Sequence, residues 1–149
     1  MTRVTRTGLF SILALALFIT GCEEPAVGDP CMPEVIPPGG FQRNESYVEV
    51  NSVQCRTRVC LVNNFSGDPG NIEDETCDGP ETEEGQPCFT REALDEAIFC
   101  SCRCSASEDS SAPTCACPDG FLCQDEIVTV GDEGVVGGYC VRDPSAEAS

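Results

Sequence analysis

The alternation of apolar and polar side chains predicts short strands within residues 47–62, over residues 98–104 and within residues 127–141. Residues 47–50 (YVEV) alternate, and residues 53–62 continue with Thr, Val and Leu. Residues 98–104 (IFCSCRC) repeat the period of two. Residues 127–130 and 135–141 are rich in β-branched side chains and bracket the turn sequence GDEG, which favours a terminal hairpin.

One short helix is expected between these strands. Thr90 is suited to cap a helix over residues 91–97, which places Leu94 and Ile98 on one face. Residues 63–87, in contrast, carry two Gly/Pro turn signals and many acids, which indicates a long acidic loop. The pattern therefore contains little continuous apolar sequence from which to build a core.

Cysteine changes this picture. The 149 residues contain 13 Cys but no His and no Trp. Cysteine at such density in a short chain is typical of secreted proteins that are held together by disulfides. We therefore expect a small, β-rich, disulfide-stapled domain with long loops and at most one short helix.

Charge and composition exclude several classes of function. The chain has 26 acidic residues against eight basic ones, a formal charge of −18, so it cannot neutralise the phosphates of a nucleic acid. The absence of His excludes Ser-His-Asp and Cys-His catalysis, His-ligated zinc and His-ligated haem. We expect no cofactor and no enzymatic activity. The alternative that stays open is a hydrolase that uses carboxylates alone, for which the candidates are Glu81, Glu83, Glu84 and Glu92.

The N-terminus has the features of an export signal. Arg3 and Arg6 precede an apolar run over residues 9–19, which is too short to span a bilayer. The run ends in the sequence ITGC at residues 19–22, which resembles the lipobox of bacterial lipoproteins. The resemblance implies that residues 1–21 are removed and that the thiol of Cys22 carries a diacylglycerol.

The cysteine count agrees with lipidation. An odd Cys in an exported protein requires an explanation, and assigning Cys22 to lipid leaves an even set of twelve. Two or three acyl chains give stable anchoring, at about 0.8 kcal/mol per buried CH₂. In enteric-type bacterial lipoproteins an Asp after the lipidated Cys signals retention in the inner membrane. Glu23 follows Cys22 here, so the resemblance implies the outer membrane, with the domain in the periplasm or on the cell surface.

The mature chain divides into three parts by composition. Residues 22–40 hold the lipidated Cys and a Pro/Gly-rich tether, in which Cys31 indicates one connection back to the body. Residues 41–142 form the cysteine-rich β domain, and residues 143–149 are expected to be a frayed tail.

The twelve remaining cysteines are expected to form disulfides and to bind no metal. Cys100, Cys102 and Cys104 would lie on one face of a strand at about 6.7 Å spacing, which is too far for them to bond one another. Each must therefore reach a different partner, but the connectivity stays open. The spacings fit neither zinc nor iron–sulfur sites, and no Cys-x-x-Cys is present. The twelve are Cys31, Cys55, Cys60, Cys77, Cys88, Cys100, Cys102, Cys104, Cys115, Cys117, Cys123 and Cys140.

Three segments carry a wider resemblance. Residues 52–60 (SVQCRTRVC), 99–104 (FCSCRC) and 138–141 (GYCV) are similar to cysteine-rich lipoproteins encoded in myxobacterial genomes. The likeness spans most of the cysteine-rich domain. It implies a lipoprotein of this kind and brings no activity with it.

Two surface features are candidates for binding. Arg56 and Arg58 lie two apart on an expected strand and so share a face, where they could bind an anion such as a lipid phosphate or pair with neighbouring acids. Residues 68–75 (DPGNIEDE) could bind Ca²⁺ weakly, or could be a solvated acidic loop.

The leading interpretation is a non-enzymatic, lipid-anchored cell-envelope protein that acts as a structural or protein-interaction module. Its partners would be the membrane, through the lipid on Cys22, and an envelope or extracellular protein. The alternative is an inhibitor or small-ligand binder, with weak Ca²⁺ binding included, displayed on the membrane.

We expect Cys22 to be the mature N-terminus and to carry the lipid. Intact-mass spectrometry of the membrane-extracted protein should show a chain that starts at Cys22 and carries two or three acyl chains. Cys22→Ser should leave the signal peptide attached and the lipid absent. A mature protein with an unmodified Cys22, or one cleaved elsewhere, would contradict this assignment.

Overall fold

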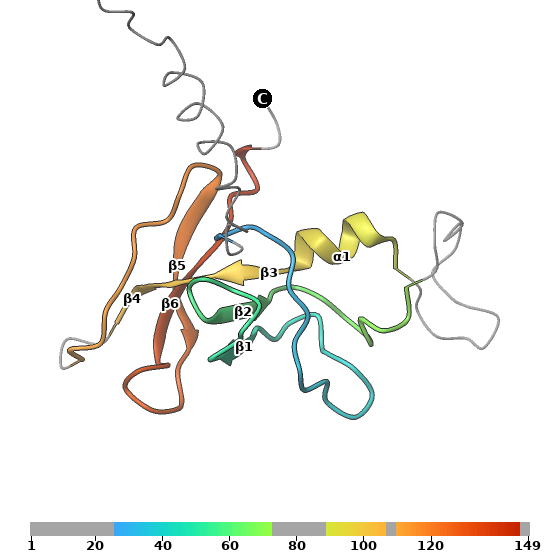
Figure 1. The fold of residues 1–149 in the computed structure, drawn as a ribbon, viewed down its shortest axis with the longest axis horizontal. Coiled ribbons are helices and arrows are strands. Elements are labelled where there is room, and N and C mark those ends of the chain that lie inside the picture. Colours follow the sequence, from blue (N-terminus) through green and yellow to red (C-terminus); the bar gives the residue numbers. More distant parts are fainter. Residues whose placement is uncertain (1–25, 73–88, 107–109, 147–149) are drawn as a thin grey trace, which may run out of the picture.

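The computed structural model describes residues 26–72, 89–106 and 110–146, which form two three-stranded antiparallel sheets and one short helix (Figure 1). The first sheet has the order β1-β2-β3 and the second has the order β4-β6-β5. The elements are β1 (Tyr47–Val50), β2 (Val59–Val62), α1 (Arg91–Ala97), β3 (Ile98–Ser101), β4 (Arg103–Ser105), β5 (Phe121–Val128) and β6 (Gly137–Arg142). The expected small, β-rich, disulfide-stapled fold is confirmed.

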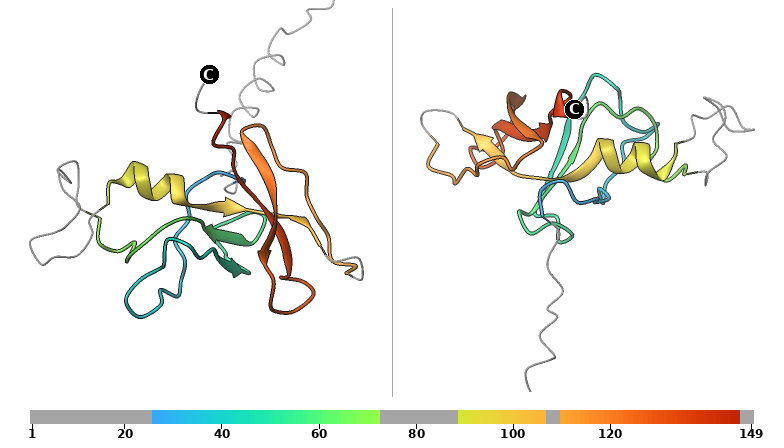
Figure 2. Two further views of the ribbon diagram at one scale, coloured as in Figure 1. Left: turned by 180° about the vertical axis from the view of Figure 1, so that it is seen from behind. Right: turned by 90° about the horizontal axis from the view of Figure 1, so that it is seen from above.

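The two sheets are joined by a direct crossing of the chain. A single strand was expected over residues 98–104, but β3 pairs with β2 whereas β4 pairs with β6, and only Cys102 separates them. The strands of the second sheet run steeply across those of the first (Figures 1 and 2). The chain changes pairing partner here because Ser101 Oγ and the backbone carbonyl of Cys102 both bond to Cys140 of β6, the first at 2.7 Å and the second at 3.1 Å.

The first sheet is the middle layer of the molecule, and all residues of β2 and β3 are buried. Side chains on one face, among them Val62, Ile98 and Cys100, pack under the helix and the N-terminal segment. Side chains on the other face, Leu61 and Phe99, pack against Tyr139 of the second sheet and its neighbour Val141. Burial on both faces explains why β2 reads as the uninterrupted apolar run VCLV.

The connection between β1 and β2 is longer than the sequence pattern indicates. Val50 pairs with Val59, so residues 51–58 form a loop where a strand was expected to begin at Val53. The Cys55–Cys100 disulfide draws this loop back over β3, and Asn51 and Arg58 adopt positive φ angles of 66° and 63°. The need to reach Cys100 therefore replaces half of the expected strand by a loop.

The described part of the N-terminal segment is held against the first sheet. Gly28 and Asp29 exchange backbone hydrogen bonds of 2.8 Å with Cys100, and Cys31 forms a disulfide with Cys60. The connection from Cys31 to the body was expected, whereas the backbone pairing of residues 28–30 with β3 was not, since an extended tether was expected over residues 22–40. Backbone pairing and a disulfide fix this stretch because β3 offers it a free hydrogen-bonding edge.

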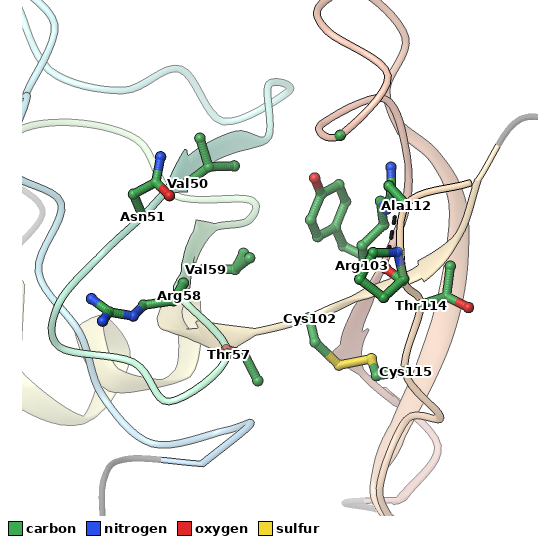
Figure 3. A pocket seen from close by; sticks show the side chains of 13 residues that line it. Val50, Asn51, Thr57, Arg58, Val59, Cys102, Arg103, Ala112, Thr114 and Cys115 are labelled. Atoms are coloured by element: carbon green, nitrogen blue, oxygen red, sulfur yellow. Dashed lines mark hydrogen bonds between the residues drawn. A yellow bond between two sulfur atoms is a disulfide. The ribbon is translucent and has the colours of Figure 1, made fainter. Parts of the chain in front are cut away.

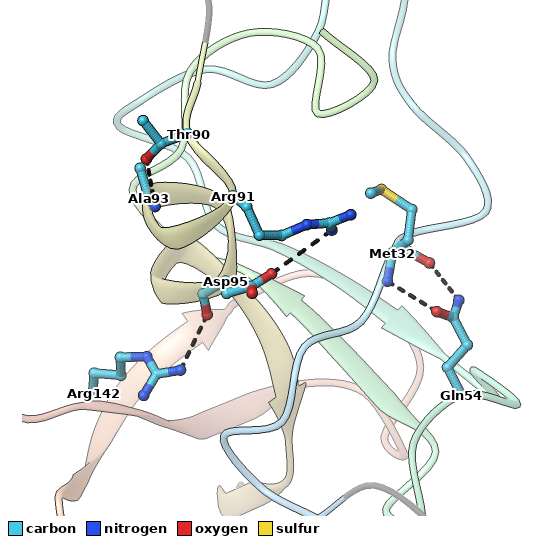
Figure 4. A network of polar contacts seen from close by, with 7 residues as sticks. All are labelled: Met32, Gln54, Thr90, Arg91, Ala93, Asp95 and Arg142. Atoms are coloured by element: carbon cyan, nitrogen blue, oxygen red, sulfur yellow. Dashed lines mark hydrogen bonds and ion pairs between the residues drawn. The ribbon is translucent and has the colours of Figure 1, made fainter. Parts of the chain in front are cut away.

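The helix forms as the sequence predicted. Thr90 Oγ1 accepts a hydrogen bond of 3.1 Å from the backbone N–H of Ala93 (Figure 4). Leu94 and Ile98 are both buried and pack in the same core cluster. With seven residues, α1 is short, and no helix in the described part of the chain is long and apolar enough to cross a bilayer.

The expected terminal hairpin is confirmed and is longer than predicted. β5 and β6 pair from Phe121↔Arg142 to Val128↔Gly137, with an irregularity between Gln124 and Val128. Gly137 has a φ of 143°, and a Cβ there would lie 2.1 Å from the carbonyl oxygen of Ser105, so only glycine fits. At the end of the described chain, residues 143–146 form a turn in a region that was expected to fray.

Arg142 connects three parts of the fold (Figure 4). Its guanidinium donates to the backbone carbonyls of Gly28, Asp95 and Glu96 at 3.0, 3.1 and 3.2 Å. It also lies 5.0 Å from the ring centre of Phe99 and 5.4 Å from that of Phe121. One side chain therefore joins the end of the second sheet to the helix and the N-terminal segment.

We expect Arg142→Met to lower the free energy of unfolding by about 2 kcal/mol, because hydrogen bonds from a charged group and two cation–π contacts are lost together. Arg91→Met is the matched control, since its ion pair with Asp95 is 3.9 Å long and exposed, and its loss should cost less than about 0.5 kcal/mol. Guanidinium chloride unfolding with the disulfides intact measures both. Equal losses in the two variants would contradict the role given to Arg142.

Candidate functional site

Ten of the expected disulfide cysteines are paired in the described residues. The bonds are Cys31–Cys60, Cys55–Cys100, Cys102–Cys115, Cys104–Cys123 and Cys117–Cys140. Cys100, Cys102 and Cys104 reach three different partners, as their spacing predicted. Cys22, Cys77 and Cys88 lie outside the described residues.

The cysteines also form three groups in which all Sγ atoms lie within 4.8 Å of one another. The groups are Cys31, Cys55 and Cys100; Cys102, Cys115 and Cys140; and Cys104, Cys117 and Cys123. Every one of these sulfurs belongs to a disulfide. A metal ion needs the thiolate form, so these groups are not ligand sets in the oxidised protein.

A cleft of about 450 Å³ lies where the two sheets meet (Figure 3). Val50 and Val59 stand on one side, and Arg103, Ala112 and Thr114 stand on the other. The Cys102–Cys115 disulfide and Tyr139 complete its walls. No Asp or Glu is among its described lining residues, so it is a largely apolar hollow without an acid–base pair.

Arg103 is the buried cation of this cleft, with 6% of its surface exposed. Its guanidinium donates to the backbone carbonyls of Glu133, Val136 and Pro113, the last two at 3.2 and 3.4 Å. Within the described residues, these carbonyls are its hydrogen-bonding partners. Arg103 thus ties the β5–β6 loop and the segment before Cys115 to the crossing between the sheets.

The arginines proposed from sequence do not share a strand face. Arg56 and Arg58 lie in the loop over residues 51–58, where the N–H of Arg58 donates to the carbonyl of Cys55 at 2.9 Å in a tight turn. Arg58 is among the residues that line the cleft, but its guanidinium points away from the space between the sheets (Figure 3). The assumption of a strand was wrong because the Cys55–Cys100 bond bends this stretch.

Of the four carboxylates singled out from sequence, the structure describes only Glu92, so their grouping stays a prediction. Glu92 is exposed on the first turn of α1, and Glu81, Glu83 and Glu84 lie outside the described residues. In the proposed Ca²⁺ loop, Asp68 Oδ1 accepts from the N–H of Gly70 at 2.8 Å and is used in its own turn. Residues 73–75 of that loop also lie outside the described residues.

A second hollow, of about 650 Å³, lies beside the irregular part of β5. Ser105 Oγ donates to Asp125 Oδ1 at 2.7 Å, and Glu126 has a φ of 57°. Both acids line the hollow. Sequence reasoning missed it because the irregularity depends on how β5 is paired with β6, and no local residue pattern marks it.

The pKa values of the two tyrosines are raised because their side chains pack against the sheets. Burial raises the pKa of Tyr139 above its ordinary value of 10.0, and the nearby Arg103 offsets part of this rise. Burial also raises the pKa of Tyr47, with Glu49 adding to the rise. The hydroxyl of Tyr139 donates to the carbonyl of Val135 at 2.6 Å and so holds the β5–β6 loop.

We expect both tyrosines to titrate above pH 10 in the folded protein and at about 10 in denaturant. The folded state holds these protons more tightly than the unfolded state, so the free energy of unfolding should fall as the pH rises above about 10. With no Trp in the chain, tyrosinate absorbance measures the titration directly. In the Tyr139→Phe variant, only the tyrosinate absorbance of Tyr47 should remain. If the absorbance that this substitution removes titrates with the pKa of an unfolded tyrosine, the burial of Tyr139 would be contradicted.

No family model, no curated protein sequence and no solved structure matches this chain.

Proposed function

We propose that the protein is a non-enzymatic lipoprotein of the cell envelope whose disulfide-stapled body binds a partner protein through the cleft between its two sheets. The lipobox-like sequence before Cys22 and the even number of remaining cysteines support anchoring by lipid. The five disulfides of the described body support a location in an oxidising compartment.

The composition of the cleft is the observation that carries the binding function. Its walls combine Val50, Val59, Ala112 and Tyr139 with a disulfide, whereas carboxylates are absent from the described lining. Such a surface can receive an apolar side chain of a partner but has no group to activate a nucleophile. Val50 is 37% exposed at the rim, at the end of the edge strand β1, where it is open to contact.

Rigidity also supports binding. The Cys102–Cys115 disulfide closes one end of the cleft, and Arg103 holds the segment that forms its far wall. A preformed surface of this kind avoids the entropy cost of ordering loops on association. Arg56 and Arg58, which stand on the exposed loop beside the cleft, remain candidate contacts at its edge.

We expect a photo-crosslinking residue at position 50 of the lipidated protein to give a discrete adduct in intact cells, because this position opens onto the cleft. The matched control is position 53, where Val53 is 74% exposed but is not part of the cleft lining. Arg56→Gln combined with Arg58→Gln should weaken the adduct and leave the disulfides intact. Adducts from position 53 alone would show that the partner contacts a surface other than the cleft. A catalytic activity of the purified protein that a single Glu→Gln substitution abolishes would refute a non-enzymatic function.

A further inference from the structure

Three disulfides of the second sheet lie side by side and form what we call the sulfur row. The row consists of Cys102–Cys115, Cys117–Cys140 and Cys104–Cys123. Cys140 Sγ lies 3.7 Å from Cys102 Sγ and 3.8 Å from Cys115 Sγ, which is van der Waals contact between two disulfides. Cys117 Sγ, at the other end of the central bond, lies within 4.8 Å of both sulfurs of the third disulfide.

Access to solvent changes along this row. Cys123 is exposed on β5, which is an edge strand of the second sheet. Cys104, Cys115 and Cys117 are half-buried. Cys102 and Cys140 have only 7% and 0% of their surface exposed. Cys123 is therefore the most exposed of the six cysteines, and a thiol in solution reaches the outer disulfide more readily than Cys102–Cys115, of which only the half-buried Cys115 faces the cleft.

We propose that Cys104–Cys123 is a thiol-exchange site for an external dithiol, and that exchange along the sulfur row carries its opening to the inner disulfides. In the first step, a thiolate of the dithiol attacks Cys123 Sγ, because Cys123 is the most exposed cysteine of the row. The Cys104–Cys123 bond breaks, a mixed disulfide forms on Cys123, and Cys104 leaves as a thiolate.

The second step takes place inside the protein. The Cys104 thiolate attacks Cys117 Sγ, which lies within 4.8 Å, so that a Cys104–Cys117 bond forms. The Cys117–Cys140 bond breaks and the electron pair leaves on Cys140. This thiolate is created in contact with both sulfurs of the next disulfide.

The third step reaches the wall of the cleft. The Cys140 thiolate attacks Cys115 Sγ, a Cys115–Cys140 bond forms, and Cys102 is released. The second thiol of the dithiol then attacks the dithiol's own sulfur in the mixed disulfide. The Cys123 thiolate leaves, and the dithiol departs as a cyclic disulfide. The dithiol is oxidised by two electrons, and the protein gains one thiol at Cys123 and one further along the row.

The first sheet provides an internal comparison. Cys31–Cys60 and Cys55–Cys100 are also neighbours, because the Sγ atoms of Cys31, Cys55 and Cys100 lie within 4.8 Å of one another. All four cysteines are at most 7% exposed, so this pair has no accessible sulfur at which exchange could begin. Sulfur proximity is thus common to both sheets, whereas an entry site is present only in the second.

The test uses the mature protein purified from cells, with any free thiol first blocked by an alkylating reagent. One equivalent of dithiothreitol is added, exchange is quenched with acid, and new thiols receive an isotopically distinct alkyl label before peptide mapping. We expect label on Cys123 together with Cys140 or Cys102, and a peptide linked through Cys104–Cys117. Label on the four cysteines of the first sheet should be about tenfold lower, because exchange needs access of the attacking thiolate. Cys77 and Cys88 are quantified in the same digest.

The combined substitutions Cys104→Ser and Cys123→Ser remove the entry site and should abolish labelling of Cys102 and Cys140. The matched control, Cys31→Ser with Cys60→Ser, should leave that labelling unchanged. If either variant fails to fold, the order in which the cysteines of the unsubstituted protein acquire the label tests the proposal instead. Label confined to Cys104 and Cys123, or label that appears first on the inner cysteines, would overturn the proposal. Because free thiols are blocked beforehand, the result does not depend on lipid at Cys22.

Discussion

The passage of the chain from β3 into β4 is the constraint on which the rest of this structure depends. Cys100, Cys102 and Cys104 occupy alternate positions there and bond to three segments that are distant in sequence. The crossing is thereby tied to the β1–β2 loop, to the segment before β5 and to β5 itself. The cleft lies where the two sheets, which share one continuous backbone, diverge from this crossing, and the Cys102–Cys115 disulfide forms part of its wall.

Around this crossing, the small hydrophobic core consists of two clusters, one on each face of the first sheet. The first sheet buries side chains on both faces, one against the helix and the N-terminal segment and one against the second sheet. Burial of this kind needs loops that cover the outer face and stay there. Cys31–Cys60 and Cys55–Cys100 fasten those coverings, which a core of this size could not hold through apolar contacts alone.

Charge is divided between the interior and the surface in an unusual way. Although acidic residues outnumber basic ones more than threefold, Arg103 and Arg142 both donate to backbone carbonyls. Carbonyls hold a guanidinium without the cost of burying a carboxylate beside it. The two cations therefore tie the β5–β6 loop, the end of the helix and the N-terminal segment to the two sheets.

The sequence by itself determined the class of the fold, the capped helix, the terminal hairpin and the rule that alternate cysteines find separate partners. These features depend on local periodicity, on capping chemistry and on the spacing of side chains along one strand. Only the tertiary structure decided that residues 98–104 divide between two sheets, that Arg56 and Arg58 leave the expected strand, and that residues 26–31 pair with β3. Two features decided these points: the pairing of the cysteines, and the change of pairing partner from β2 to β6 at Cys102. Both depend on contacts between residues that are far apart in sequence, which a local sequence pattern does not reveal.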